Sequence, residues 1–158
     1  MPTEPSAEGP RFVYALVSVT ARLAIGAAGV AVIIRDAQKN TLKQHTARIA
    51  CANQEGAVYE AVKMALNEAR ALGARQVTVY SDDATVVGHL GRGVEVPEPL
   101  MPAYMQARAL MNQFREARVC FIDEVNNAKA RRLSELALES DEEDSRAYQS
   151  PGLPLSFQ

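Results

Sequence analysis

The stretch Gln76–Val87, which reads Q-V-T-V-Y-S-D-D-A-T-V-V, decides the fold of this chain. Its first half is β-branched and aromatic, which favours a short and largely buried strand over residues 76–80. Asp83 can cap a helix that begins at Ala84, because its carboxylate accepts free N–H groups of the first turn. Asp82 is then left at the carboxyl end of a strand, where open α/β sheets bind their ligands. A carboxylate there indicates a metal ligand or a general base, and a satisfied turn residue is the alternative.

Length and composition favour one globular domain. The chain has 158 residues and is 47% apolar, which is enough to bury a core without disulfides or metal. No apolar run approaches the roughly 18 residues that span a membrane. Cys51 and Cys120 are too few and too far apart for a disulfide framework or a zinc site, so we expect a reducing cytoplasm. His45 and His89 have no partner at ligand spacing, so we expect structural or surface roles for them. We expect no cofactor, unless the chain is a metal-dependent enzyme that uses Mg²⁺.

The net charge of −2 is unevenly distributed along the chain. Residues 1–10 carry −2 and residues 139–158 carry −4, so the remaining body sums to +4. A basic body with an acidic tail suits nucleic acid, with the tail competing for the same face. A tail that only aids solubility is the alternative. Both ends lack apolar periodicity, so we expect residues 1–10 and 139–158 to be disordered.

Apolar periodicity between these tails predicts alternating strands and helices. Residues 11–20 are apolar on both faces, which is typical of a central strand. Residues 41–50 are the least apolar strand and are expected at an edge. Residues 21–28 are expected to form a loop, and Asn53 is expected to cap the first long helix. The expected strands cover residues 11–20, 29–35, 41–50, 76–80 and 118–123, and the expected helices residues 55–72, 84–90, 100–114 and 128–138.

Three segments together resemble the ribonuclease H-like superfamily, in particular the compact type 1 ribonuclease H domain. They are G-A-A-G-V-A-V-I-I-R-D (residues 26–36), Y-S-D-D-A-T-V-V (residues 80–87) and N-A-K-A-R-R-L-S-E-L-A-L (residues 127–138). The last is close to the family pattern N-x-x-A-D-x-L-A. The resemblance covers residues 11–138 and implies an α/β fold, a five-stranded mixed sheet flanked by helices, with the first strand parallel to the strand that holds Asp82.

The resemblance also implies an active site that this chain has largely lost. Family members cleave the RNA strand of RNA–DNA hybrids with two magnesium ions, which four carboxylates hold. Residue by residue, those positions fall on Ser18, Val58, Asp82 and Arg131, so Asp82 is the one matching catalytic carboxylate. Magnesium needs several oxygen ligands in octahedral geometry at about 2.0–2.1 Å. We therefore expect no metal ligand set and a catalytically degenerate module.

An alternative is a divergent ribonuclease H that uses Mg²⁺ through relocated carboxylates, with Glu55 and Asp83 assisting Asp82. Against it, the cation at Arg131 opposes metal binding by Coulomb repulsion. We expect Arg131 to form an ion pair with Asp82, direct or through one water, where the metals would stand, and thereby to lower the pKa of Asp82.

Four basic residues are candidates for contact with nucleic-acid phosphates: Arg92, Lys129, Arg131 and Arg132. The expected partner is an RNA–DNA hybrid or another nucleic acid, or else a protein partner or a second copy in a homodimer. A solvated surface is the alternative explanation for four dispersed cations.

Overall fold

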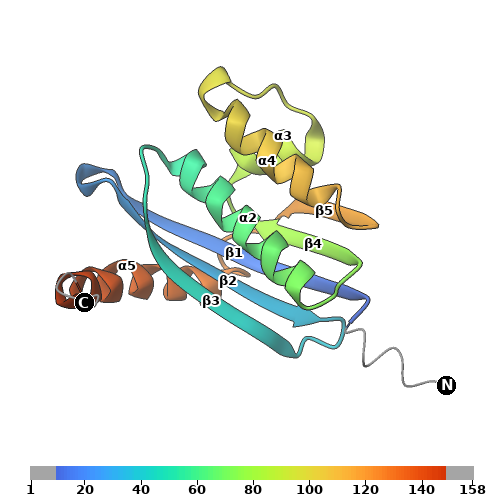
Figure 1. Ribbon diagram of the computed structural model, residues 1–158, viewed down its shortest axis with the longest axis horizontal. Helices are drawn as coiled ribbons and strands as arrows, with labels where there is room; N and C mark the ends of the chain where they lie inside the picture. The colour runs from blue at the N-terminus through green and yellow to red at the C-terminus, as the bar shows by residue number, and fades with distance from the viewer. Residues whose placement is uncertain (1–9, 149–158) are drawn as a thin grey trace.

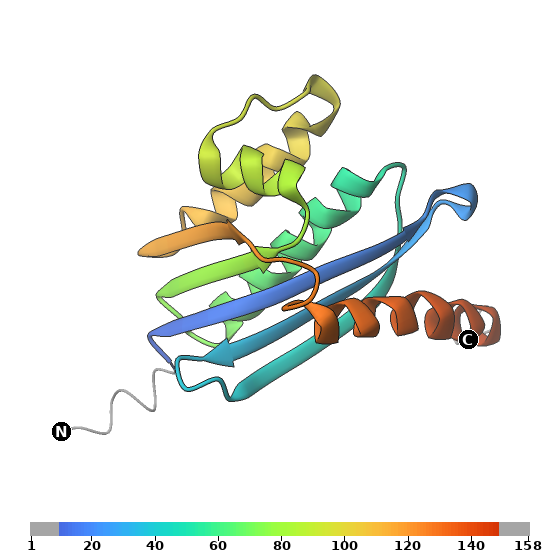
Figure 2. The ribbon, with the colours of Figure 1, turned by 180° about the vertical axis from the view of Figure 1, so that it is seen from behind.

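The computed structural model describes the backbone of residues 10–148 and the side chains of residues 10–139. It shows a sheet with α2, α3 and α4 on one side and α5 on the other (Figures 1 and 2). The elements in chain order are β1 (Phe12–Arg22), η1 (Leu23–Ile25), β2 (Ala27–Asp36), β3 (Thr41–Ala50), α2 (Gln54–Ala71), β4 (Gln76–Ser81), α3 (Ala84–Arg92), η2 (Glu98–Leu100), α4 (Met101–Met111), β5 (Glu116–Phe121) and α5 (Ala128–Tyr148).

The sheet has five strands in the order β3-β2-β1-β4-β5. β1 pairs antiparallel with β2 and parallel with β4, so the sheet is mixed. The expected topology is confirmed, with β1 at the centre and β3 at an edge. Parallel pairing of β1 with β4 brings the carboxyl ends of both strands to the same end of the sheet, which is the feature that builds the site.

The main core lies between the sheet and helices α2, α3 and α4. A buried hydrogen bond joins two of these helices, because Tyr59 Oη in α2 lies 2.8 Å from His89 Nδ1 in α3. Burial raises the pKa of Tyr59 to about 12. His89 is thus a structural residue, as expected. His45 lies 2.8 Å from Glu68 Oε2 and ties the edge strand β3 to α2.

The smaller core lies on the other side, where α5 packs on β2 at very short range. It joins Leu16, Ile33 and Ala130. A Cβ atom built on Gly29 would lie 2.0 Å from the carbonyl oxygen of Ser134. Only a residue without a side chain fits between the strand and the helix backbone, which accounts for the glycine in G-A-A-G.

Two expected boundaries are wrong. Residues 21–28 are not a loop, because β1 and β2 continue as a hairpin until Arg22 pairs with Ala27. Gly26 closes the single 3-10 turn between them with a φ of 65°. The final helix does not end at Leu138 but continues to Tyr148, since no Gly or Pro interrupts that stretch. The tail predictions for residues 1–9 and 149–158 lie outside the described residues.

Smaller differences concern β5, which begins two residues earlier than expected, and α4, which ends three residues earlier. Among residues 10–148, no helix is both long and apolar enough to cross a bilayer.

Candidate functional site

A pocket of about 230 Å³ lies at the carboxyl ends of β1 and β4, beside the first turns of α2 and α5. Its lining residues are Ser18, Val19, Thr20, Gln54, Asp82, Asp83, Glu124, Arg131 and Glu135. Three of the four positions that the resemblance implies therefore converge, as expected. The fourth does not reach the pocket, because Val58 is 2% exposed and packs in the main core.

Asp82 has an amide as its hydrogen-bond partner. Asn127 Nδ2 donates to the main-chain oxygen of Val17 at 2.8 Å and lies 3.5 Å from Asp82 Oδ2. Burial raises the pKa of Asp82, and the nearby Glu124 carboxylate acts in the same direction. The hydrogen bond from Asn127 and the charge of Arg131 oppose this rise without cancelling it. The expectation of a lowered pKa is thus wrong, because desolvation outweighs the favourable contacts.

Arg131 is held by other carboxylates. Its Nη1 donates to Glu124 Oε1 at 2.6 Å, and its Nε lies 3.6 Å from Glu135 Oε2. The expected direct ion pair with Asp82 is therefore absent. Glu124 and Glu135 are both exposed, so pairing with them desolvates Arg131 less than pairing with the partly buried Asp82 would.

Three hydroxyl groups occupy the region beside the lost aspartate of β1. Ser134 Oγ in α5 donates to the carbonyl oxygen of Arg131 at 2.8 Å. Thr20 Oγ1 lies 2.7 Å from Ser134 Oγ, and the buried Ser18 Oγ lies 3.4 Å from it. These contacts join β1 to α5 without any charge, so Ser18, Thr20 and Ser134 form a structural contact at the position where the resemblance implies an aspartate.

Of the two acids that could assist Asp82, one is used in helix capping and the other does not line the pocket. Asp83 caps α3, since its Oδ1 accepts from the N–H of Val86 at 3.0 Å, as expected. Asn53 caps α2 by accepting from Gly56 N–H at 2.7 Å. Gln54, and not Glu55, lines the pocket from this helix. The relocated ligand set that included Glu55 is therefore not assembled.

The donor set does not fit two magnesium ions. Among the described residues, no group of three or more His, Cys, Asp or Glu side chains is arranged to hold a metal ion. Asp82 is approached by an amide N–H, Val58 supplies no oxygen, and a guanidinium lies in the pocket. Octahedral coordination by several oxygen atoms cannot be built from these groups.

The four basic candidates are spread over two elements. Arg92 is the last residue of α3, where it borders a separate pocket with Val94 and Phe121. Lys129, Arg131 and Arg132 lie on the first turns of α5, and all four side chains are exposed. Their role in nucleic-acid binding stays a prediction.

Several site residues were missed by reasoning from the sequence. Asn127 opens the N-x-x-A segment and could have been read from that pattern. Thr20 follows Ser18 by two residues and so shares its face of the strand. Ser134 and Glu135 lie one helical turn after Arg131. Glu124 had no signal, because it lies in the loop before α5.

The fold and the position of this pocket define the chain as a ribonuclease H-like domain. The sequence model of the family described as reverse transcriptase-like matches residues 17–137, so the chain belongs to that family. It is 29% identical over 128 residues to the bifunctional protein Rv2228c of Mycobacterium tuberculosis and, equally, to protein Mb2253c of Mycobacterium bovis. The match covers 80% of this chain, which spans only 35% of the length of either relative.

Solved structures agree with this assignment. The N-terminal RNase H domain of Rv2228c from Mycobacterium tuberculosis superposes with a TM-score of 0.78 at 26% identity, covering 85% of this chain and 98% of that chain. RNase H1 from the archaeon Halobacterium salinarum gives 0.77 at 22% identity, over 82% and 98%. LC11-RNase H1, solved in complex with an RNA/DNA hybrid, gives 0.71 at 24% identity, over 82% and 97%. The last two likenesses concern the fold alone.

Proposed function

We propose that this chain is a catalytically degenerate ribonuclease H-like module that binds nucleic acid or a protein partner without cleaving RNA–DNA hybrids. The observation that carries the proposal is which residues occupy the four positions where the resemblance implies carboxylates. One is a buried valine in the core, one is a serine joined to α5, and one is an arginine paired with Glu124 and Glu135. The remaining Asp82 faces an amide. A two-metal mechanism needs both ions bracketing the scissile phosphate, and this set cannot hold them.

Nucleic acid is the favoured partner class because residues 11–138 carry a net charge of +4 and exposed cations lie near the pocket. The exposed cations Arg92, Lys129 and Arg132 are the contacts that we propose for its phosphates, together with Arg131. For a protein partner, the supporting feature is exposed apolar surface near the same end of the sheet, where Phe121 is 53% and Val125 84% exposed. A reducing cytoplasm remains our proposed location, since neither Cys51 nor Cys120 forms a disulfide.

The second candidate is a divergent metal-dependent ribonuclease H. Four carboxylates line the pocket, those of Asp82, Asp83, Glu124 and Glu135, and this is the observation in its favour. It is the weaker candidate because Asp83 is used as a helix cap and the two glutamates neutralise Arg131.

The deciding experiment is a cleavage assay on a labelled RNA–DNA hybrid with Mg²⁺ or Mn²⁺, with an active type 1 ribonuclease H as the positive control. We expect no cleavage by this chain, and hybrid binding that weakens in the Arg92→Gln and Arg132→Gln variants. Arg131→Asp alone should not produce cleavage, since Ser18 and Val58 still supply no charge. Metal-dependent cleavage that disappears in Asp82→Asn, purified in the same way, would establish the second candidate instead.

A further inference from the structure

The end of the sheet opposite the site has a face that no described helix covers. α5 packs on β1, β2 and β3, and Figure 2 shows the amino-terminal ends of β1 and β4, together with β5, beyond its reach. Tyr14 and Tyr80 lie at the border of this face, where they pack against the smaller core beneath α5. Because paired residues in neighbouring strands point to the same side of a sheet, the strand register gives the side chains of this face. One row across the sheet reads Arg35, Tyr14, Thr78 and Arg118, and the row below it reads Phe12, Gln76 and Glu116.

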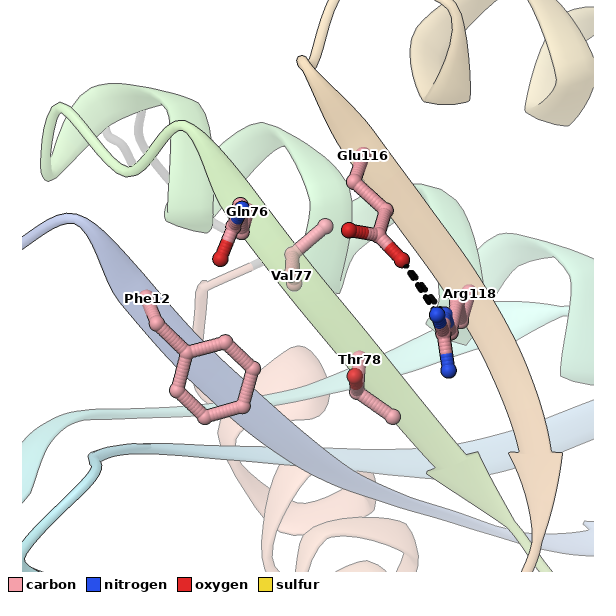
Figure 3. A pocket seen from close by; sticks show the side chains of 6 residues that line it. All are labelled: Phe12, Gln76, Val77, Thr78, Glu116 and Arg118. Atoms are coloured by element: carbon pink, nitrogen blue, oxygen red, sulfur yellow. Dashed lines mark hydrogen bonds and ion pairs between the residues drawn. The ribbon is translucent and has the colours of Figure 1, made fainter.

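This face carries a set of aromatic rings. The ring centroids of Phe12 and Tyr14 lie 6.5 Å apart, and those of Tyr14 and Tyr80 lie 6.1 Å apart in an edge-to-face arrangement. All three side chains are only partly buried. Phe12 borders a shallow pocket of about 230 Å³ that also involves Gln76, Thr78 and Arg118 (Figure 3). Partly exposed rings on a sheet, beside a pocket with polar walls, are the kind of surface on which nucleobases stack.

Three arginines lie at the amino ends of the strands that form this face. Arg11, Arg75 and Arg115 come directly before β1, β4 and β5, and their backbones are joined in a row. Arg75 N–H donates to the carbonyl oxygen of Arg11 at 3.0 Å, and Arg115 N–H donates to that of Arg75 at 2.9 Å. All three side chains are exposed. This backbone row places three exposed arginines side by side at the amino ends of β1, β4 and β5, next to the strands that form the aromatic face.

Two further arginines lie on the face itself. Arg118 is exposed and pairs with Glu116 at 2.6 Å, as Figure 3 shows. Arg35 has a buried Nε with no hydrogen-bond partner among the described residues. Among the described residues, the acids at this end are Glu116, which Arg118 neutralises, and Asp36, whose carboxylate accepts from the Gln38 and Asn40 N–H groups.

We propose that this face binds single-stranded RNA, with bases stacked on Phe12 and Tyr14 and phosphates held by the surrounding arginines. Guanidinium groups pair with phosphate oxygens and also stack on bases, so rings and arginines serve one ligand. Gln76 and Thr78 offer hydrogen-bonding groups between the rings and Arg118, where a ribose 2′-hydroxyl can be recognised. This surface is separate from the pocket at Asp82, so the proposal does not depend on whether that pocket binds or cleaves a hybrid.

The test measures anisotropy of a labelled oligouridine of about twelve nucleotides, within the usual site size of such surfaces, against the full chain. Phe12→Leu keeps an apolar side chain but removes the ring. We expect it to weaken binding by about tenfold, which corresponds to about 1.4 kcal/mol, with an unchanged salt dependence. Arg118→Gln should instead reduce the slope of log affinity against log salt by about 0.7, the value for one phosphate contact with a single strand.

Matched variants at the other end of the sheet are the controls. Phe121→Leu removes an exposed ring at the carboxyl end of β5, and Arg22→Gln removes an exposed arginine at the end of β1. Both should leave oligouridine binding unchanged. The corresponding oligodeoxyuridine should bind more weakly than the RNA, and equal binding would overturn the assignment to RNA. Binding that Phe12→Leu and Arg118→Gln leave intact would overturn the proposed surface.

A second measurement uses the unaltered chain, so it does not depend on whether the Phe12 variant folds. Crosslinking of the unaltered chain to an oligonucleotide with 4-thiouridine, followed by peptide mass spectrometry, should modify the peptide that contains Phe12 and Tyr14. Crosslinks confined to α3 and α5 would overturn the proposal. If the chain forms a dimer by light scattering that Phe12→Leu dissociates, and no oligouridine is bound, the face is a contact between copies and the RNA assignment is wrong.

Discussion

The two ends of the sheet differ in charge and in how their polar groups are used. At the carboxyl end, four carboxylates and one guanidinium line the pocket, and nearly every group is engaged with a neighbour in the chain. At the amino end, five arginines lie on or directly before the strands that form a partly exposed aromatic face, and the buried Nε of Arg35 has no hydrogen-bond partner among the described residues. The comparison teaches that the fold determines where side chains meet, while the side chains decide which ligand that place accepts. Changes to the buried groups at the carboxyl end should therefore alter stability, and changes to the exposed rings and arginines at the amino end should alter oligouridine binding.

The largest effect is expected when the glutamate of the family pattern is restored at Val58. Val58→Glu places a carboxylate in the main core, where Val58 is buried. We expect a loss of about 3 kcal/mol in the free energy of unfolding at pH 8. Burial raises the pKa of such a carboxyl, so the loss should shrink as the pH falls and the group becomes protonated. Chemical denaturation at pH 8 and pH 4.5 measures this.

The matched control is Val58→Gln, whose cost should not vary with pH. Stabilisation of Val58→Glu by Mg²⁺ would contradict the comparison, because it would mean that the carboxyl end can still assemble a cation site.

The next effect concerns the amide beside Asp82. Asn127→Ala removes the donor to the Val17 carbonyl and should cost about 2 kcal/mol, the usual penalty for leaving a buried polar group unpaired. Asn126→Ala, in the adjacent exposed position, should cost less than about 0.5 kcal/mol. Urea denaturation of both variants checks the difference, and equal costs would show that Asn127 does not hold the carboxyl end together.

A smaller effect is expected at Asp82 itself. Its folded-state pKa is raised above the ordinary value of 3.8, so the folded state prefers the protonated carboxyl. The ionised group therefore destabilises the fold, increasingly as the pH rises through the folded-state pKa. Asp82→Asn should stabilise the protein by at most about 1 kcal/mol at pH 7, with no gain below pH 3.8. Thermal melts across this pH range measure the gain, and a loss at pH 7 would mean that Asp82 has a cationic partner.

The smallest effect is expected for the exposed ion pairs at the two ends. Arg131→Gln and Arg118→Gln each break a pair on the surface, and such pairs contribute little. Neither should shift the melting temperature by more than about one degree, in low or high salt. A large shift for Arg131→Gln would show that its pairing with Glu124 and Glu135 carries structure at the carboxyl end.

The fold could be predicted from the sequence because its signals are local and redundant. The sequence of residues 76–83 predicts a strand, a turn and a helix cap in consecutive positions, and the structure has all three. The hairpin at residues 21–28 could not be predicted from local polarity, because its pairing depends on the register between β1 and β2. Likewise, the acidic composition after Leu138 indicated disorder, whereas α5 continues there to Tyr148. A helix can continue through such residues without an apolar face.

The site was predicted less completely, because its details depend on competition between partners. Reasoning from the sequence identified the convergence of Ser18, Asp82 and Arg131, but it paired the two charged residues directly. The structure gives Arg131 two exposed carboxylates that lie closer and cost less to desolvate. Such a choice depends on distances in the loop before α5, which no pattern in the chain reveals.

The close approach of Gly29 to Ser134 also bears on the order in which the chain folds. The meander β1–β3 forms from neighbouring segments, so its loops close at low entropic cost. Its second face, with Leu16 and Ile33, is completed only by α5, more than ninety residues further along the chain. During synthesis from the N-terminus, that apolar strip is therefore exposed until almost the whole domain has emerged. A bulkier side chain at Gly29 would prolong this aggregation-prone interval as well as weaken the finished domain.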